Sequence, residues 1–150
     1  RDVEREILPQ VQDAQLGLMA WSPLAGGLLS GKFDRAGSSD PEARRTHIDF
    51  PPVEPEHGYT VIDAVKRVAA RVEATPAQVA LAWLLARPGV TTAIVGARRP
   101  EQLQDNLRAL ELALSEQDMS ELDAASSLPT YYPAWVQAMT NVHRDGFLAR

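Results

Sequence analysis

The stretch TTAIVGARRPEQLQDNL, residues Thr91–Leu107, predicts a short buried strand followed by a glycine turn and a helix. Gly96 supplies the turn, and Pro100 suits the first turn of a helix, where a backbone N–H has no intrahelical acceptor. A helix N-terminus that follows a strand leaves such N–H groups free to bind an anion. Arg98 and Arg99 add positive charges of the kind that pair with phosphate oxygens. The stretch therefore predicts either a phosphate site or a surface loop whose arginines are solvated.

The composition is that of a folded domain without an excess of positive charge. The chain has 150 residues, of which 45% are hydrophobic and 23% charged, and its net charge is −5. This length suits a single domain over residues 1–150, and the negative charge argues against nucleic acid or an anionic membrane as the main partner. The absence of cysteine excludes disulfides and thiolate chemistry and fits a cytoplasmic location. No apolar run approaches the length of a membrane span.

A second strand is expected over Leu16–Ser22, where nearly every side chain is apolar, as in parallel strands that are covered on both faces. The alternation of strands and helices predicts an α/β fold with a parallel sheet. Two parallel strands alone would leave both edges of the sheet unpaired. Since the chain also begins at Arg1 without a methionine, we expect either a missing N-terminal part that supplies further strands or pairing with another copy of the chain.

Capping signals mark several helices. Thr75 and Pro76 combine an N-cap hydroxyl with a proline at the first helical position, and the apolar residues that follow predict a well-buried helix. Ser115 and Asp118 have the spacing of a capping box. Residues 33–58 show no hydrophobic period and are expected to form a long loop. Helices are predicted over residues 2–15, 60–73, 76–87, 100–110 and 115–126.

The first strand leads into a glycine-rich segment. Gly26 to Lys32 matches the pattern G-x-x-x-x-G-K of phosphate-binding P-loops, but Phe33 replaces the residue that binds magnesium and no long helix follows. We therefore expect a glycine-rich loop that lets the backbone approach a ligand, with Lys32 either a phosphate partner or a surface lysine. Trp21 lies at the carboxyl end of the strand, where ligands of parallel α/β folds gather. It is either a stacking surface for a flat ring or a core side chain.

No catalytic or metal-binding set can be assembled from the sequence. The histidines, His47, His57 and His143, fall in predicted loops or in the tail, and none has a metal-ligand spacing to another histidine or to a cluster of acids. The sequence contains no G-x-S-x-G or H-E-x-x-H motif and no carboxylate pair at a convincing spacing. We therefore expect no metal site and no general acid or base among these residues.

Two segments taken together resemble the C-terminal half of the aldo-keto reductases. The first is WSPLAGGLLSGK, residues 21–32, and the second is IVGARRPEQLQDNL, residues 94–107. Residues 1–7 resemble the helix after the sixth barrel strand, and residues 75–85 resemble the helix before the eighth. The resemblance implies an α/β fold that is part of a (β/α)8 TIM barrel, with this chain forming the last two βα units and the C-terminal helices. It also implies reduction of aldehydes and ketones by hydride transfer from NADPH.

The resemblance places a cofactor site on these two segments. It implies that the Trp21 ring stacks on the nicotinamide and that Arg98, beside a helix N-terminus, favours NADP over NAD. Arg44 or Arg45, in the predicted loop, would add a phosphate contact. The residues next to the pyrophosphate would be Ser22, Pro23, Leu24, Ala25, Gly26 and Lys32. The residues around the adenosine and its 2′-phosphate would be Gly96, Arg98, Gln102, Asp105 and Asn106.

The catalytic Asp, Tyr, Lys and His of the family come from its N-terminal half, and this chain has no matching positions. We therefore expect cofactor-binding residues without catalytic ones, a chain that is inactive alone, and a small carbonyl substrate that meets the complete protein. Two alternatives stay open. One is a non-catalytic NADP-binding or regulatory subunit of the same fold, as channel-associated members of the family are. The other is an inactive truncated product that oligomerises.

Overall fold

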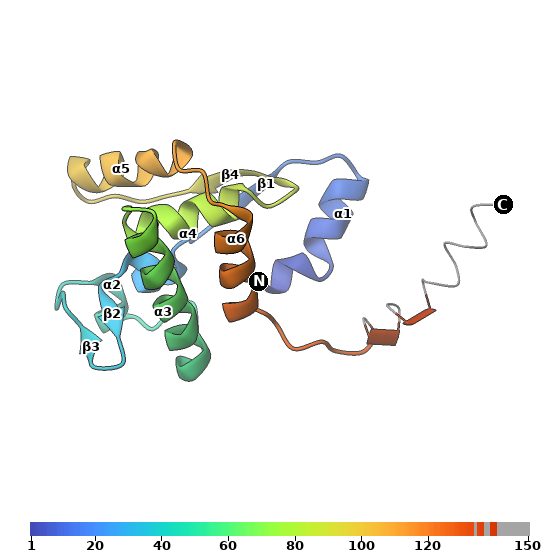
Figure 1. Ribbon diagram of the computed structural model, residues 1–150, viewed down its shortest axis with the longest axis horizontal. Coiled ribbons are helices and arrows are strands. Elements are labelled where there is room, and N and C mark those ends of the chain that lie inside the picture. The colour runs from blue at the N-terminus through green and yellow to red at the C-terminus, as the bar shows by residue number, and fades with distance from the viewer. Residues whose placement is uncertain (134, 137–138, 141–150) are drawn as a thin grey trace.

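The computed structural model describes residues 1–133, 135–136 and 139–140, so that His143 lies outside the described residues. Two strands, β1 (Leu18–Trp21) and β4 (Val90–Ile94), pair in parallel, with Trp21 opposite Ile94. The helix α4 (Pro76–Leu85) packs against β4. On α4 packs α3 (Pro55–Arg71), and α6 (Glu116–Ala125) packs on α3 (Figure 1). The predicted mixed α/β fold with a small parallel sheet is confirmed.

The two-stranded sheet has one covered and one open face. Along β1, Leu18 and Ala20 are half-buried, whereas Met19 and Trp21 are 66% and 61% exposed. Side chains alternate between the two faces of a strand, so α4 covers only the face of Leu18 and Ala20. The expectation that this strand is covered on both faces is therefore wrong for the described residues, because Met19 and Trp21 remain exposed. The prediction of a buried strand over Thr91–Val95 is wrong as well, since Thr91, Thr92 and Ile94 of β4 are exposed.

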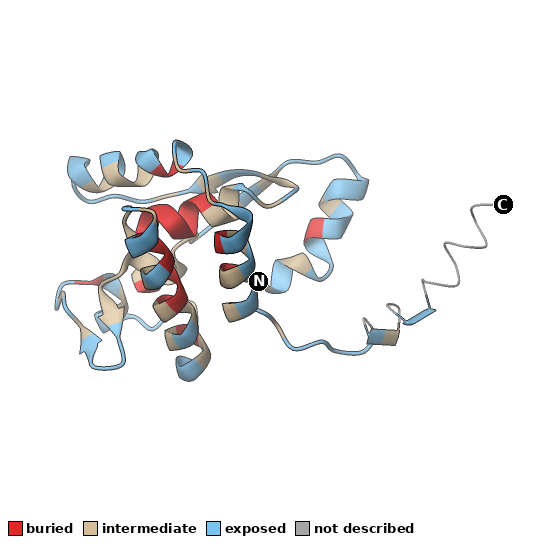
Figure 2. Cartoon of the chain, viewed as in Figure 1, coloured by how far each residue is buried: buried red, intermediate tan, exposed pale blue. Residues whose placement is uncertain are grey.

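The core lies where three helices meet. Buried positions gather on α4 and on the sides of α3 and α6 that face one another (Figure 2). The burial predicted for α4 is confirmed, since all six residues of 77–82 are buried. The central cluster consists of Ala64, Val65, Val68, Ala69, Val79 and Leu122. Burial of such apolar side chains contributes about 1.5–3 kcal/mol each for the larger ones, so this cluster holds the elements that position β1 and β4.

The N-cap predicted at Thr75 and the capping box predicted at Ser115 and Asp118 are confirmed, and Thr75 also forms a capping box with Gln78. The Thr75 hydroxyl accepts a hydrogen bond from the Gln78 N–H, and the Gln78 side chain accepts one from the Thr75 N–H. Ser115 and Asp118 cap α6 in the same reciprocal way. The helix α5 (Pro100–Leu107) continues into one 3-10 turn, η3 (Arg108–Leu110). All three helices start where the sequence predicts. For α4 and α6 the reason is that a cap depends only on residues close together in the chain.

The long loop predicted over residues 33–58 is partly wrong. It contains a small hairpin, β2 (Phe33–Asp34) with β3 (Gly37–Ser38), and the short helix α2 (Arg44–His47). The helix α3 begins at Pro55, because the Glu54 carboxylate accepts hydrogen bonds from the N–H groups of the first turn and Pro55 needs no acceptor there. His47 and His57 consequently lie in helices and not in a loop.

The N-terminal segment forms a 3-10 turn, η1 (Asp2–Glu4), and then α1 (Ile7–Asp13). Arg1 anchors this segment to the end of α6, where its guanidinium donates to the Ser126 hydroxyl at 2.9 Å (Figure 1). Among the described residues, no helix is both long enough and apolar enough to cross a bilayer. Within that same part of the chain, no three His, Asp or Glu side chains are grouped in a way that could hold a metal ion.

A network of ion pairs joins α3 to α6. Arg71 donates to the Asp118 carboxylate at 2.6 Å and to the Glu121 carboxylate at 2.8 Å, and Arg67 donates to Glu121 at 2.9 Å. The Ser115 hydroxyl and Arg71 lower the pKa of Asp118, and the two arginines lower the pKa of Glu121. A carboxyl group whose pKa is lower in the folded state stabilises the fold at neutral pH, and this contribution is lost as the pH falls through the folded-state pKa.

Acid should therefore lower the free energy of unfolding of the wild-type chain more than that of a Glu121→Gln variant. The variant starts less stable at neutral pH, because Arg71 and Arg67 lose a charged partner, and it loses less stability between about pH 5 and about pH 2. Urea unfolding across this range measures both slopes. Glu73→Gln removes one exposed charge at the end of α3 and should keep the wild-type slope. Equal slopes for the wild type and Glu121→Gln would contradict the prediction.

Candidate functional site

A cavity of about 610 Å³ lies at the carboxyl ends of β1 and β4. Its size is typical of small-molecule sites, and ligands of parallel α/β folds bind at this end of the strands. The structure brings almost all of the predicted site residues to this cavity, and Ala25 is the exception. The predicted residues that line it are Trp21, Ser22, Pro23, Leu24, Gly26, Lys32, Arg44, Gly96, Arg98, Gln102, Asp105 and Asn106.

Trp21 is a surface residue at the end of β1 and not a core side chain. Its side chain is on the open face of the sheet. The ring of Phe50 lies beside it, with the two ring centroids 5.9 Å apart and the ring planes tilted by 54°. The alternative of a buried tryptophan is therefore wrong. A large ring left exposed beside a cavity can stack on a planar group of a ligand.

The glycine-rich segment forms two tight turns, η2 (Ala25–Ser30), and not the loop-to-helix start of a P-loop. The Gly26 N–H donates to the Ser22 hydroxyl at 3.1 Å, and Gly26 has a positive φ of 68°. A Cβ at this position would also overlap the carbonyl oxygen of Phe50. Only glycine fits both demands. The turn thus keeps its backbone close to the loop that flanks Trp21, and Lys32 leads into β2.

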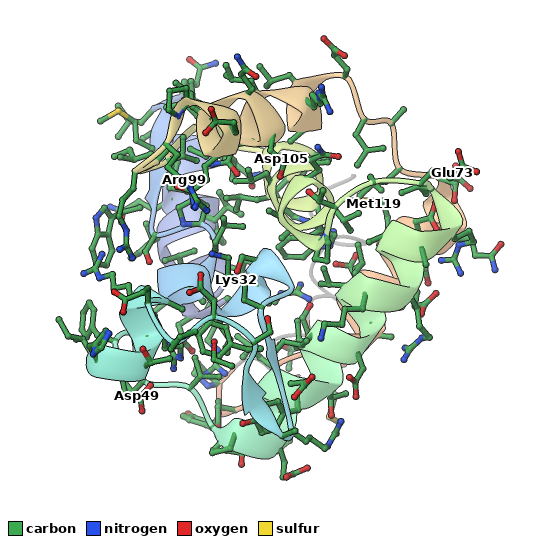
Figure 3. The ribbon with its side chains drawn as sticks, turned by 90° about the vertical axis from the view of Figure 1, so that its left-hand side faces the viewer. Lys32, Asp49, Glu73, Arg99, Asp105 and Met119 are labelled. Atoms are coloured by element: carbon green, nitrogen blue, oxygen red, sulfur yellow. The ribbon has the colours of Figure 1, made fainter. Side chains whose placement is uncertain are left out.

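Lys32 lines the cavity but already has a partner. Its ammonium lies 2.6 Å from the Asp40 carboxylate, and this contact lowers the pKa of Asp40. Figure 3 shows this side of the molecule, with Lys32 between Asp49 and the α5 region that carries Arg99 and Asp105. Lys32 therefore lies where it could contact a phosphate, as one of the two alternatives requires, but its ammonium is already paired with Asp40. The sequence contains no signal for this pair, because Asp40 lies in a segment without any period.

The two arginines of α2 have different surroundings. Arg45 is buried, with its side chain 8% exposed, and donates to the carbonyl oxygens of Ala25 at 3.1 Å and Pro51 at 2.8 Å. It also pairs with Asp49 at 2.6 Å. Arg44 instead lines the cavity and is exposed. Arg45 therefore holds the loop together, and Arg44 is the arginine that is available to a ligand. The carbonyl oxygen of Ala25 binds Arg45, and Ala25 does not line the cavity.

The start of α5 forms the opposite wall. The Arg98 N–H donates to the Gln102 side-chain oxygen at 3.0 Å, so Gln102 satisfies a backbone donor just before the helix. The Arg98 guanidinium donates to the carbonyl oxygen of Glu42 at 3.1 Å and remains exposed. Arg99 is exposed as well but is not among the residues that line the cavity. Of the two adjacent arginines, Arg98 is thus the one placed at the site.

Asp105 faces the cavity and also joins α5 to α4. Its carboxylate accepts a hydrogen bond from the Thr75 hydroxyl at 3.0 Å and another from the Gln78 amide at 2.6 Å. Both donors belong to the capping box of α4. Asp105 therefore fixes the position of α5, and with it the cavity-lining side chains of Gln102 and Asn106. This role depends on a contact between two helices and has no signal in the local sequence.

Comparison with known proteins shows the family of the chain. Residues 1–127 match the Aldo/keto reductase family. The chain is 36% identical over 123 residues to the "Uncharacterized oxidoreductase YrpG" of Bacillus subtilis, which covers 82% of this chain and 36% of that protein. It is 37% identical over 115 residues to the "Putative voltage-gated potassium channel subunit beta" of Schizosaccharomyces pombe (72% and 33%). It is 30% identical over 122 residues to the "Probable aldo-keto reductase 1" of Glycine max (81% and 35%).

The match covers most of this chain and a smaller part of each relative. The chain spans about a third of the length of these curated relatives. Within the chain, the matched region reaches from Arg1 to Ser127 and contains both strands of the parallel sheet and every residue that lines the cavity. The chain therefore belongs to the aldo/keto reductase family.

Proposed function

We propose that this chain is the NADP(H)-binding part of an oxidoreductase that reduces aldehydes and ketones by hydride transfer. The observation that carries the proposal is the cavity at the carboxyl ends of β1 and β4, where the exposed ring of Trp21 and three cationic side chains meet. In this proposal β1 and β4 are the last two strands of a (β/α)8 barrel. The cationic side chains are those of Lys32, Arg44 and Arg98.

The chemistry of these residues fits the cofactor. A nicotinamide dinucleotide needs a flat apolar surface for its ring, and Trp21 offers one at the open face of the sheet. Its phosphates need cations, which Lys32 and Arg44 provide beside the glycine-rich turn and Arg98 provides at the start of α5. The amide side chains of Gln102 and Asn106 supply donors and acceptors for the adenosine.

In this function the bound cofactor would supply the hydride, and the chain would hold and orient it. Trp21 would hold the nicotinamide ring by stacking and so set its orientation. The cations would hold the phosphates, and the hydrogen bonds of Asp105 with Thr75 and Gln78 would hold the adenosine wall on α5 against α4. We propose that the acid that protonates the carbonyl oxygen comes from residues outside this chain. In this proposal Tyr131 and Tyr132, which follow α6 and are exposed, do not take this role, because their position in the tail does not match that of the family's catalytic residues.

Binding and turnover test the proposal separately. Titration of the chain with NADPH, followed by the quenching of tryptophan fluorescence, should show saturable binding that a Trp21→Ala variant weakens. NADPH oxidation with a panel of aldehydes should show no turnover by the chain alone. Absence of NADPH binding would contradict the cofactor assignment, and turnover by the chain alone would contradict the assignment of the acid to residues elsewhere.

The names of two relatives favour a second function, that of a regulatory subunit. Two of the relatives carry names of voltage-gated potassium channel β subunits, at 37% and 32% identity. A regulatory subunit of this kind would bind NADP(H) at the same cavity and show negligible turnover even with a complete barrel. The turnover assay on a protein that includes the remaining barrel strands distinguishes it from the enzyme.

The open face of the sheet also needs a cover in this proposal. Met19 and Trp21 of β1 lie exposed on it. We propose that further barrel strands cover it, either from an N-terminal part of the same protein or from another copy of the chain. A cytoplasmic location is proposed only on the cysteine-free composition.

A further inference from the structure

One short segment touches both walls of the cavity. Asp40 pairs with Lys32, which follows the glycine-rich turn, at 2.6 Å. Glu42, two residues later, accepts a hydrogen bond through its carbonyl oxygen from the Arg98 guanidinium, at 3.1 Å. Arg98 belongs to the opposite wall, at the start of α5. The segment Asp40–Glu42 therefore engages two of the cations that face the cavity.

The segment is held in this conformation by its own hydrogen bonds. The Asp40 carboxylate accepts from the Glu42 N–H at 3.0 Å, and the Asp40 N–H donates to the Ser38 hydroxyl at 3.1 Å. The Ala43 N–H donates to the Asp40 carbonyl oxygen at 3.0 Å. Lys32, the N–H of Glu42 and the charge of Arg99 lower the pKa of Asp40, so its carboxylate is ionised at neutral pH. A fixed negative charge thus neutralises Lys32.

We propose that Asp40 is a built-in competitor for the anionic ligand of this cavity. In the free chain the Asp40 carboxylate pairs with the Lys32 ammonium. A phosphate group that binds Lys32 must therefore displace the Asp40 carboxylate. Since the same segment also binds Arg98, a ligand that reaches only one wall breaks one contact and leaves the other in place. Asp40 therefore lowers the affinity of the cavity for an anion that binds Lys32, and the inference deepens the proposed NADP(H) function on which its choice of ligand rests.

This competition predicts a change in ligand affinity that can be measured without turnover. Asp40→Asn keeps the side-chain oxygen that accepts from the Glu42 N–H, but it removes the negative charge. Inorganic pyrophosphate should bind the variant about fivefold more tightly than the wild type, because a partly exposed ion pair no longer has to be broken. Isothermal titration calorimetry on the chain and its variants gives the affinities.

Two controls distinguish displacement of Asp40 from Lys32 from the effect of simply removing a negative charge near the cavity. Glu42→Gln removes the same charge from the same segment, and its backbone carbonyl still accepts from Arg98, so its affinity for pyrophosphate should stay within about twofold of the wild type. In a Lys32→Met background, Asp40→Asn should give no further gain. Pyrophosphate should also speed amide hydrogen exchange at residues 40–43 of the wild type, since the segment leaves its cations.

Each outcome has a defined meaning. An unchanged or weaker affinity of Asp40→Asn for pyrophosphate overturns the inference, as does an equal gain from Glu42→Gln or slower exchange at residues 40–43. If the pyrophosphate results are as expected and NADPH binds no variant, the competition stands and the proposed cofactor is wrong. If NADPH binds the wild type and Asp40→Asn changes neither affinity, the competition is wrong and the cofactor site stands.

Discussion

Replacing Arg98 by alanine should weaken NADPH binding by about 10- to 100-fold, because a guanidinium that pairs with a phosphate forms strong charge-assisted hydrogen bonds. NADH lacks the 2′-phosphate, so its binding should change by less than about twofold. Arg98 faces the cavity and remains exposed, with one hydrogen bond to the Glu42 carbonyl oxygen. Fluorescence titrations of the chain with both cofactors give the two ratios.

The neighbouring arginine provides the matched control. Arg99 is exposed and does not line the cavity, so Arg99→Ala removes the same charge from the same turn and should weaken NADPH binding by only about two- to threefold. If Arg98→Ala weakened NADPH and NADH equally, the assignment of Arg98 to the 2′-phosphate would fail. If Arg99→Ala had the larger effect, the assignment would move to Arg99.

Replacing Leu81 by alanine should lower the free energy of unfolding by about 3 kcal/mol, since the removal of a buried leucine side chain costs about 2–5 kcal/mol. Leu81 is 2% exposed in α4, the helix on which β4, α3 and α5 all pack. A loss of this size is a large part of the stability of a domain, about 5–15 kcal/mol in total. Urea unfolding followed by circular dichroism measures the change.

The same substitution at an exposed leucine is the control. Leu110, in η3, is 71% exposed, and Leu110→Ala should change the free energy of unfolding by no more than about 0.5 kcal/mol. A similar loss in both variants would mean that α4 is not the centre of the core. Under conditions where Leu81→Ala is folded, its NADPH affinity should equal that of the wild type, because Leu81 does not line the cavity.

The parts of the fold that depend on neighbouring residues are predictable from the sequence. The caps of α4 and α6 begin at Thr75 and Ser115 as predicted, because an N-cap is made by side chains within three or four residues of the backbone that they cap. The strands β1 and β4 are also found where apolar runs place them. Their direct parallel pairing follows the alternation of strands and helices.

The errors in placing helices and short strands fall where local patterns are weak. Residues 33–58 have no hydrophobic period, and the hairpin β2–β3 and the helix α2 within them are tied to other elements: Arg35 to Asp63 in α3, and Lys66 to the Phe33 carbonyl oxygen at 3.0 Å. The start of α3 at Pro55 was predictable in principle from Glu54 and Pro55, an acidic cap before a proline. The cap was not predicted because it lies within residues 33–58, which the sequence predicts to form one loop.

By itself, the sequence determined the α/β class, the two strands and the starts of α4, α5 and α6, because each depends on residues close together in the chain. The two segments that form the cavity were predicted from their resemblance to the aldo-keto reductases. Only the tertiary structure decided how the charged side chains are used. It paired Lys32 with Asp40, buried Arg45 against the Ala25 and Pro51 carbonyl oxygens, and left Arg44 at the cavity. The physical reason is that a long cationic side chain binds whichever carboxylate or carbonyl oxygen the folded chain brings within its reach.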